Sequence, residues 1–331
     1  MSFPGETPPR DAEIAASAVS AVSAVSAPPA VSSVIAAGEG EETPLRRIAA
    51  DFADSRLALA GLALFLAILA VAVLAPVISP QNPYDLAQLD VLDSRLEPGA
   101  RSGDGKQVFW LGTDDQGRDM LSAIFYGLRI SLGVGVSATL CALALGLTLG
   151  LAGAFLGGRV DTLIMRVADI QLSFPAILIA LILLALLGQG VDKIIIALVA
   201  VQWAYYARTA RSAALVERGK EYMEAARGLG LSRSRIVLKH LLPNALPPLI
   251  VVGTVQVAHA IALEATLSFL GLGLPITEPS LGLLISNGFT YMLSGKYWIS
   301  FFPGVALLAT IVSINLVGDQ LRDVLNPRLQ I

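Results

Sequence analysis

The sequence predicts an all-α integral membrane protein, and two observations lead to that prediction. Hydrophobic residues make up 55% of the 331 residues and charged residues only 15%, with a mean hydropathy of +0.69. A soluble domain of this length is ordinarily less apolar and more charged. The chain also contains several uncharged runs of about 20 residues, the length that an α-helix needs to cross the hydrocarbon of a bilayer.

The first 45 residues differ in composition from the rest of the chain. Ala, Val and Ser repeat there around Pro28 and Pro29. Because such small side chains bury too little surface to offset the entropy of ordering, we expect residues 1–45 to form a disordered cytoplasmic tail. A signal peptide is the alternative, but Arg10 is followed by Asp11 and Glu13, and no Leu-rich stretch comes next.

Six membrane-spanning helices are expected within a transmembrane domain over residues 46–331. Their ranges are about 57–77, 130–158, 170–191, 192–215, 246–271 and 297–318. Pro175 is expected to kink the third helix, and Pro247 and Pro248 to open the fifth. The fourth has an uncharged part shorter than a span, so we expect it to extend into a basic region whose side chains reach the membrane surface.

Lysine and arginine positions predict the orientation of these helices. With the amino terminus inside, the inner segments hold about twice as many of these residues as the outer ones. Both termini are therefore expected in the cytoplasm. Residues 79–128 become an extracytoplasmic segment, and residues 216–245 become a cytoplasmic loop.

The cytoplasmic loop contains the sequence EYMEAARGLGLSRSRIVLKHLLPNA. We expect a short helix over residues 221–227, a turn at Gly228 and Gly230, and a second short helix that Ser232 caps and Pro243 ends. Two short helices joined in this way could fit a groove on a partner protein. A loop that rests on anionic lipid is an equally good interpretation of the spacing alone, because basic residues follow the turn.

This loop resembles the signature of bacterial ABC importer permeases, which is Glu-Ala-Ala-x-x-x-Gly, nine residues, then Ile-x-Leu-Pro. The matching positions, with His240 in place of the isoleucine, are Glu224, Ala225, Ala226, Gly230, His240, Leu242 and Pro243. In that family the motif forms the coupling helices that dock on ATPase subunits. The resemblance therefore implies an ATPase-coupling role for these seven residues.

Four other blocks resemble the C-type permease of the dipeptide, oligopeptide and nickel importers. They are LGTDDQGRDMLSAIFYGLRISLGVG, GGRVDTLIMRVADIQLSFPAILIAL, LEATLSFLGLGLP and NLVGDQLRDVLNPRL, and with the loop they span about residues 48–329. Leu281 stands where that family often has Trp, and Asn326 where it has Asp. These two departures leave the class of substrate open.

The resemblance implies a fold, an assembly and a location. The fold would be that of a type I ABC importer permease with six transmembrane helices, in the cytoplasmic (inner) membrane of a bacterium. The chain would form half of a pore together with a second, related permease subunit. Two cytoplasmic ATPase subunits would bind ATP and magnesium, and an extracytoplasmic substrate-binding protein would deliver the cargo. Dipeptides or oligopeptides are the expected cargo, with nickel or another small solute as the alternative.

The chain itself shows no motif for catalysis. It has no Gly-x-x-x-x-Gly-Lys-Ser/Thr loop, no His-Glu-x-x-His sequence and no Gly-x-Ser-x-Gly elbow. Its two histidines, His240 and His259, are far apart in sequence. We therefore expect no catalytic, cofactor or metal site in this chain, and the spread net charge of −3 gives no reason to expect nucleic acid as a partner.

Polar residues within the spans are candidates for lining a pore, because they are costly in the membrane. His259, about 18 Å along the fifth helix at about 1.5 Å per residue, falls near mid-membrane. It could line a pore with Gln202 and Asn315, or bond a neighbouring helix. Glu264 falls nearer the outer surface, where we expect it to contact an outer lid or water. Small residues such as Gly146 and Gly150 are expected to permit close helix packing.

Two other classes of function remain open on these residues. A stand-alone secondary transporter or channel would need no ATPase, and a membrane-anchored scaffold would need no pore. Copurification of ATPase subunits with the solubilised chain distinguishes the importer from both. All three classes require the membrane-spanning fold that the composition predicts.

Overall fold

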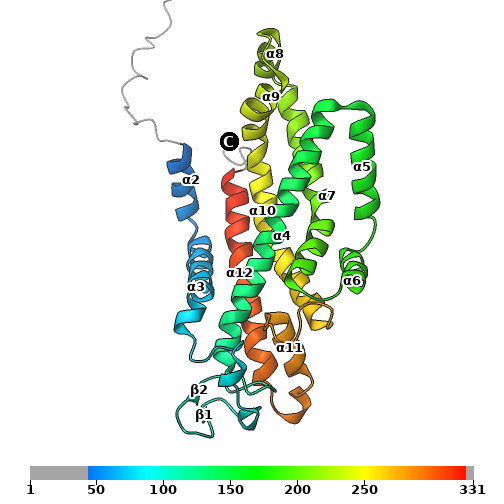
Figure 1. Ribbon diagram of the computed structural model, residues 1–331. Coiled ribbons are helices and arrows are strands. Elements are labelled where there is room, and N and C mark those ends of the chain that lie inside the picture. Colours follow the sequence, from blue (N-terminus) through cyan, green and yellow to red (C-terminus); the bar gives the residue numbers. More distant parts are fainter. Residues whose placement is uncertain (1–43, 326–331) are drawn as a thin grey trace, which may run out of the picture. The chain divides into compact units, whose positions relative to one another are not determined.

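The computed structural model describes residues 44–325, and helices make up most of this part of the chain (Figure 1). The first half contains α2 (Pro44–Ala53), α3 (Arg56–Ile78), η2 (Leu86–Gln88), η3 (Val91–Asp93), β1 (Ala100–Arg101), β2 (Val108–Phe109), α4 (Met120–Leu156), α5 (Gly158–Leu172) and α6 (Ala176–Leu187). The second half contains α7 (Val191–Arg218), α8 (Glu221–Gly228), α9 (Arg233–Arg235), the π-helix η4 (Ile236–Leu241), α10 (Leu242–Phe269), α11 (Leu281–Phe289), η5 (Met292–Ser294) and α12 (Trp298–Leu325). The tail expected over residues 1–45 lies outside the described residues except for the first two of α2, and so does Asn326.

The described residues from 48 to 325 belong to one compact unit, and its long helices build the bundle. α4 packs along α7, and α10 contacts both of them, while α12 packs against α3, α10 and α11 (Figure 1). One apolar cluster joins α3, α4, α10, α11 and α12, and a second joins α4, α6, α7 and α10. α4 and α10 contribute to both clusters and thus hold the two parts of the core together.

Glycines on α4 set its close approach to α7. A Cβ atom at Gly146 would stand 2.5 Å from the Trp203 carbonyl oxygen, and one at Gly150 would stand 2.4 Å from the Ala207 carbonyl oxygen. Real side chains essentially never make contacts this short, so only glycine permits the observed packing. The packing role that the sequence predicts for Gly146 and Gly150 is confirmed.

The third expected span is not a single kinked helix. α5 ends at Leu172, α6 begins at Ala176, and the two helices are bent by 91° at this break. Pro175 is the N-cap residue of α6 and cannot donate the hydrogen bond that would continue α5. At about 1.5 Å per residue the 12 residues of α6 are about 18 Å long, too short to cross the hydrocarbon. The break at Pro175 therefore lies within the predicted range, 170–191, and only α5 and α6 taken together could form this span.

The six spans expected from the sequence are confirmed only in part. Among residues 44–325, four helical segments are long and apolar enough to cross a membrane, namely 56–78, 120–156, 233–269 and 298–325. The bent pair α5 and α6 would raise the count to five if it acts as one span. α7 is 28 residues long, but it is not among the helices that meet the test of length and apolar composition. Polar residues such as Gln202 and Arg208 interrupt its apolar run.

The helix before Pro243 does not end there, contrary to the prediction. η4 passes directly into α10, and Pro243 lies in the first turn of α10, the part of a helix where proline is best tolerated. The backbone N–H of Leu242 bonds the Val237 carbonyl across the wider π-turn. Pro247 and Pro248 lie inside α10 instead of opening it. The loop is therefore joined to the spanning helix without a break.

The segment between α3 and α4 is held by buried polar groups. β1 and β2 pair antiparallel, with Ala100 opposite Phe109. Arg118 Nε lies 2.6 Å from Asp114 Oδ2, with the two side chains 1% and 0% exposed, and Arg118 Nη1 donates to the Ile276 carbonyl at 3.2 Å. Asp119 accepts from the backbone N–H of Ser122 at 2.9 Å and so caps α4. This cap places the start of α4 at Met120, ten residues before the helix start expected at residue 130.

Candidate coupling loop and polar pocket

The short helix α8 has one buried face and one exposed face. Met223 and Ala226 are 1% and 5% exposed, and they pack in a cluster with Leu151 of α4 and Ile236 of η4. Glu224 and Ala225 are exposed. The coupling motif thus combines two tasks, because Ala226 fixes the helix to the bundle while Glu224 and Ala225 remain accessible to a partner.

Gly230 ends α8 in a left-handed conformation. Its φ is +68°, which favours glycine over residues with a side chain. The backbone N–H of Leu231 bonds the Ala226 carbonyl at 3.3 Å, and that of Gly230 bonds the Arg227 carbonyl at 3.0 Å, which together form a Schellman motif. No atom lies within 4 Å of the place a Cβ would take, so the backbone conformation, and not crowding, requires the glycine.

The second part of the loop carries the remaining motif residues. Ser232 has the backbone conformation of an N-cap but makes no side-chain capping bond, contrary to the prediction. Ile236 and Leu241 are buried, while Pro243 is exposed. His240 and Leu242 are half-buried, and the His240 carbonyl accepts a bond from Asn244 Nδ2 at 2.7 Å.

A hydrogen-bond network that the sequence did not reveal ties the loop to two long helices. Tyr222 Oη donates to Glu217 Oε2 at 2.7 Å, and Asn244 Nδ2 donates to Tyr222 Oη at 3.3 Å. Lys220 Nζ donates to Glu217 Oε1 at 2.6 Å. Burial and the neighbouring Glu217 carboxylate raise the pKa of Tyr222 to about 12. The network joins the end of α7, α8 and the start of α10.

A polar pocket of about 490 Å³ lies between α6, α7 and α10. Its polar lining residues are Gln202, Tyr205, Gln256, His259 and Thr266, and the other lining residues are apolar. Gln202 Nε2 donates to the Gln256 carbonyl at 3.1 Å, while Gln202 Oε1 is buried with no hydrogen-bond partner among the described residues. The structure thus brings together Gln202 and His259, two of the three candidates for lining a pore. Asn315 lies on α12 and is not one of the pocket's lining residues.

Glu264 is fully buried rather than in contact with water. It is 0% exposed, and its carboxylate accepts bonds from Ser131 Oγ of α4 at 2.9 Å and from Ser268 Oγ at 2.8 Å. Ser280, at the start of α11, adjoins the same carboxylate. The expected contact with water is therefore wrong, because depth along a helix does not tell which face a side chain occupies.

Two ion pairs fix α5 against α7. Arg211 binds Asp161 through two bonds, with Nε–Oδ1 and Nη2–Oδ2 distances of 2.5 and 2.6 Å, and Arg208 pairs with Asp169. The two aspartates come from the GGRVDTLIMRVAD block. Basic residues expected to reach the membrane surface therefore bind acidic partners on a neighbouring helix.

Comparison with known protein families gives this geometry a context. The family described as "Binding-protein-dependent transport system inner membrane component" matches residues 142–331. The N-terminal transmembrane domain of oligopeptide transport permease C matches residues 43–98. The chain belongs to the permease C family of binding-protein-dependent transport systems. It is thus a multi-pass inner membrane permease, with apolar helices that fit that location.

Curated relatives cover most of the permease. A putative peptide transport system permease protein of Brucella suis is 41% identical over 271 residues, which are 82% of this chain and 88% of that one. A di/tripeptide transport permease of Pseudomonas aeruginosa is 36% identical over 87% of this chain and 93% of its own length. An oligopeptide transport permease of Bacillus subtilis is 37% identical over 84% of this chain and 88% of its own length.

A solved structure supports the fold of the permease. The inward-facing methionine ABC transporter MetNI, in its CY5 native crystal form, matches with a TM-score of 0.51 and 23% identity. The match covers 62% of this permease and 97% of that chain. The permease therefore has the type I ABC importer fold.

Proposed function

We propose that this permease forms half of the translocation pore of an ATP-driven importer for dipeptides or oligopeptides. The observation that carries the proposal is the exposed Glu224 and Ala225 surface of α8, which is fixed to the bundle by buried Met223 and Ala226. A rigid, accessible projection of this kind suits docking in a groove of a second protein. The names of the relatives from Pseudomonas and Bacillus favour peptides as the cargo.

The proposed assembly contains four other subunits. Two cytoplasmic ATPase subunits bind ATP and magnesium and dock on the α8 loop, so this chain supplies no catalytic group. A second, related permease completes the pore, and an extracytoplasmic binding protein delivers the peptide. Both termini face the cytoplasm in this arrangement, which follows the distribution of lysine and arginine.

The proposed mechanism is alternating access driven through the loop. Closure of the ATPase subunits on ATP displaces α8, and the displacement passes to α7 and α10 through Glu217, Tyr222 and Asn244. Turning an inward-facing form from dominant to rare requires about 5.5 kcal/mol of differential interaction, which nucleotide binding has to supply. Glu224 binds the ATPase groove, and Gly230 maintains the turn that presents it.

The polar pocket is the proposed lining of the passage in this half of the pore. Its polar groups, among them Gln202 and His259, are amides, hydroxyls and an imidazole, and no Asp, Glu, Lys or Arg is among its lining residues. A lining without carboxylate, ammonium or guanidinium groups allows peptides of different charge to pass without binding tightly.

Reversing the charge of Glu224 tests the docking surface. We expect Glu224→Lys to lower both the copurification of ATPase subunits with the solubilised permease and the uptake of labelled dipeptide by cells. Asp319→Lys, which reverses the charge of an exposed carboxylate on α12, is the matched control and should change neither. Full copurification and uptake with Glu224→Lys would contradict the docking role. If the cells take up nickel instead of peptide, the proposed cargo is wrong but the docking role of Glu224 is unaffected.

A further inference from the structure

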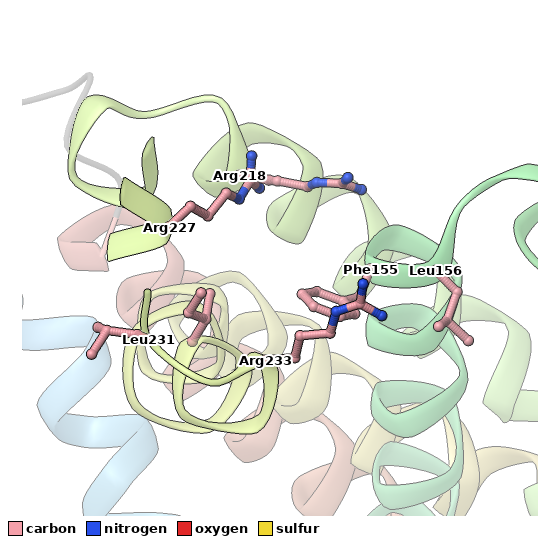
Figure 2. Close-up of a pocket in the computed structure, with 7 residues that line it drawn as sticks. Phe155, Leu156, Arg218, Arg227, Leu231 and Arg233 are labelled. Atoms are coloured by element: carbon pink, nitrogen blue, oxygen red, sulfur yellow. The ribbon is translucent and has the colours of Figure 1, made fainter. Parts of the chain in front are cut away.

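A basic pocket of about 510 Å³ lies between the ends of α4 and α7 and the α8 to η4 loop, apart from the polar pocket. Its lining residues are Phe155, Leu156, Arg218, Arg227, Leu231, Arg233 and Ile236. Figure 2 shows the three arginine side chains around the same space, with Phe155 beside Arg233. The three arginines and Phe155 come from four different helices, namely α7, α8, α9 and α4. The folding of the loop onto the bundle therefore creates the pocket.

The charge of the basic pocket is not balanced by carboxylates. The ion pairs found among residues 44–325 involve none of Arg218, Arg227 and Arg233. Arg218 Nη1 donates to the carbonyl of Ala154, and the side chains of Arg227 and Arg233 are exposed. Three neighbouring guanidinium groups repel one another and attract an anion, and the planar guanidinium matches the oxygens of a phosphate group.

The other wall of the basic pocket is apolar. Phe155 is half-buried, and Leu156 is 62% exposed at the last residue of α4. α4 is one of the helices long and apolar enough to span a membrane, and its sequence carries no charged residue from Ile130 to its last residue, Leu156. This uncharged run therefore brings the hydrocarbon boundary close to the end of α4 in the proposed topology. A ligand that satisfies both walls has an anionic head and a hydrocarbon chain.

We propose that the basic pocket binds the phosphate of an anionic glycerophospholipid, whose acyl chains lie against the end of α4. Basic pockets at the cytoplasmic ends of transmembrane helices are suited to such headgroups. The bound lipid joins Arg227 and Arg233 of the loop to Phe155 of the bundle, and so steadies the loop. This inference goes beyond the proposed function, because it requires neither a particular cargo nor a docked ATPase.

The alternative occupant of the basic pocket is an acidic side chain of a protein partner. The apolar wall favours the lipid, since a carboxylate would leave Leu156 exposed. The proposed partner surface on α8 is formed by Glu224 and Ala225, whereas the pocket is lined by Arg227 of the same helix. A lipid in the pocket and a protein on α8 can therefore bind together.

Lipid retention by the purified full chain tests the proposal directly. The chain in neutral detergent is titrated with phosphatidylglycerol or phosphatidylcholine, and bound lipid is counted by native mass spectrometry. We expect a preference for phosphatidylglycerol that Arg227→Gln with Arg233→Gln weakens roughly 25-fold. That figure corresponds to roughly fivefold, or about 1 kcal/mol, per arginine near a lipid phosphate.

The matched control removes the same charge from the same loop. Arg235 and Lys239 are exposed basic residues that do not line the pocket, so Arg235→Gln with Lys239→Gln should retain the preference within about twofold. Arg227→Lys with Arg233→Lys keeps the charge and should retain part of the preference for phosphatidylglycerol. Circular dichroism and size-exclusion elution verify the fold of each variant.

Three results would overturn the proposal. If Arg227→Gln with Arg233→Gln leaves the preference for phosphatidylglycerol unchanged, the pocket does not bind the lipid. If the Arg235 and Lys239 control loses the preference to the same extent, the anionic lipid is attracted only by the overall positive charge of the loop. If inorganic phosphate displaces phosphatidylglycerol at equal concentration, the apolar wall contributes nothing and the site is one for free anions. Because the chain is tested alone, these results are independent of ATPase docking.

Discussion

Ser131 of α4 donates a hydrogen bond of 2.9 Å to the Glu264 carboxylate of α10, and both side chains are 0% exposed. Ser268 donates a second bond to the same carboxylate. Close packing surrounds this contact, because a Cβ at Gly282 of α11 would stand 2.2 Å from the Ala265 carbonyl oxygen. The carboxylate is therefore the polar centre of a junction between α4, α10 and α11.

Replacing Glu264 by leucine should destabilise this junction. Glu264→Leu leaves two buried serine hydroxyls without an acceptor, and each such unpaired group costs about 1–3 kcal/mol. Glu264→Gln keeps an acceptor oxygen and should be milder. Thermal unfolding of the solubilised permease measures both variants. A midpoint for Glu264→Leu equal to that of the wild type would show that the hydrogen bonds contribute nothing to stability.

A methyl group at Gly146 should push α4 away from α7. The added Cβ would stand 2.5 Å from both Trp203 O and Tyr206 Cβ, and overpacking of this kind costs about 1–3 kcal/mol. Gly133→Ala is the matched control, since nothing lies within 4 Å of a Cβ at that position of the same helix. We expect Gly146→Ala to unfold at lower temperature and Gly133→Ala to be neutral or slightly stabilising. Equal midpoints for the two variants would refute the close-packing argument.

A side chain at Gly230 should uncouple ATP hydrolysis from uptake. Gly230→Val must adopt a φ of +68°, which costs roughly 1–2 kcal/mol for a residue with a Cβ, so the Schellman motif opens and Glu224 loses its fixed position. Gly228→Ala, whose Cβ also meets nothing within 4 Å but whose φ is helical, is the control. We expect normal membrane levels for both variants and, in reconstituted importer, ATPase activity without transport for Gly230→Val alone. Normal transport by that variant would count against the coupling role.

Tyr222 should titrate well above an ordinary tyrosine. Its folded-state pKa is raised from 10.0 to about 12 by burial and by the Glu217 carboxylate. Because the folded state holds this proton more tightly, the stabilisation is complete below pH 10 and is lost as the pH rises through about 12. Ultraviolet titration of the wild type and of Tyr222→Phe should differ by one tyrosine ionisation near pH 12, which the variant lacks. If the ionisation that the variant lacks occurs near pH 10 instead, the hydrogen-bond network does not raise the pKa of Tyr222.

The sequence predicted the features that depend on composition or on short motifs. Uncharged runs located α3, α4 and α12, although the cap at Asp119 moved the start of α4, because apolar counting does not detect capping. Glu224 and Gly230 were found through the resemblance to a permease signature. The role predicted for Pro243 is wrong, because proline is tolerated in the first turn of α10 and does not have to end the helix before it. The Tyr222 network joins residues from three elements, so no local pattern could indicate it.

The unbroken passage from η4 into α10 has a mechanical consequence. α10 is 28 residues and thus about 42 Å long. It holds Asn244 at its cytoplasmic end in the proposed topology, Gln256 and His259 along its middle, and Glu264 near its far end. A hinge at Pro243 would have separated the motion of these groups from the motion of the loop. Gln256, His259 and Glu264 lie beyond Pro247 and Pro248 on one stretch of α10 that contains no further proline. A turn or tilt that reaches this stretch from the loop therefore moves the polar pocket and the distant serine-bound carboxylate together.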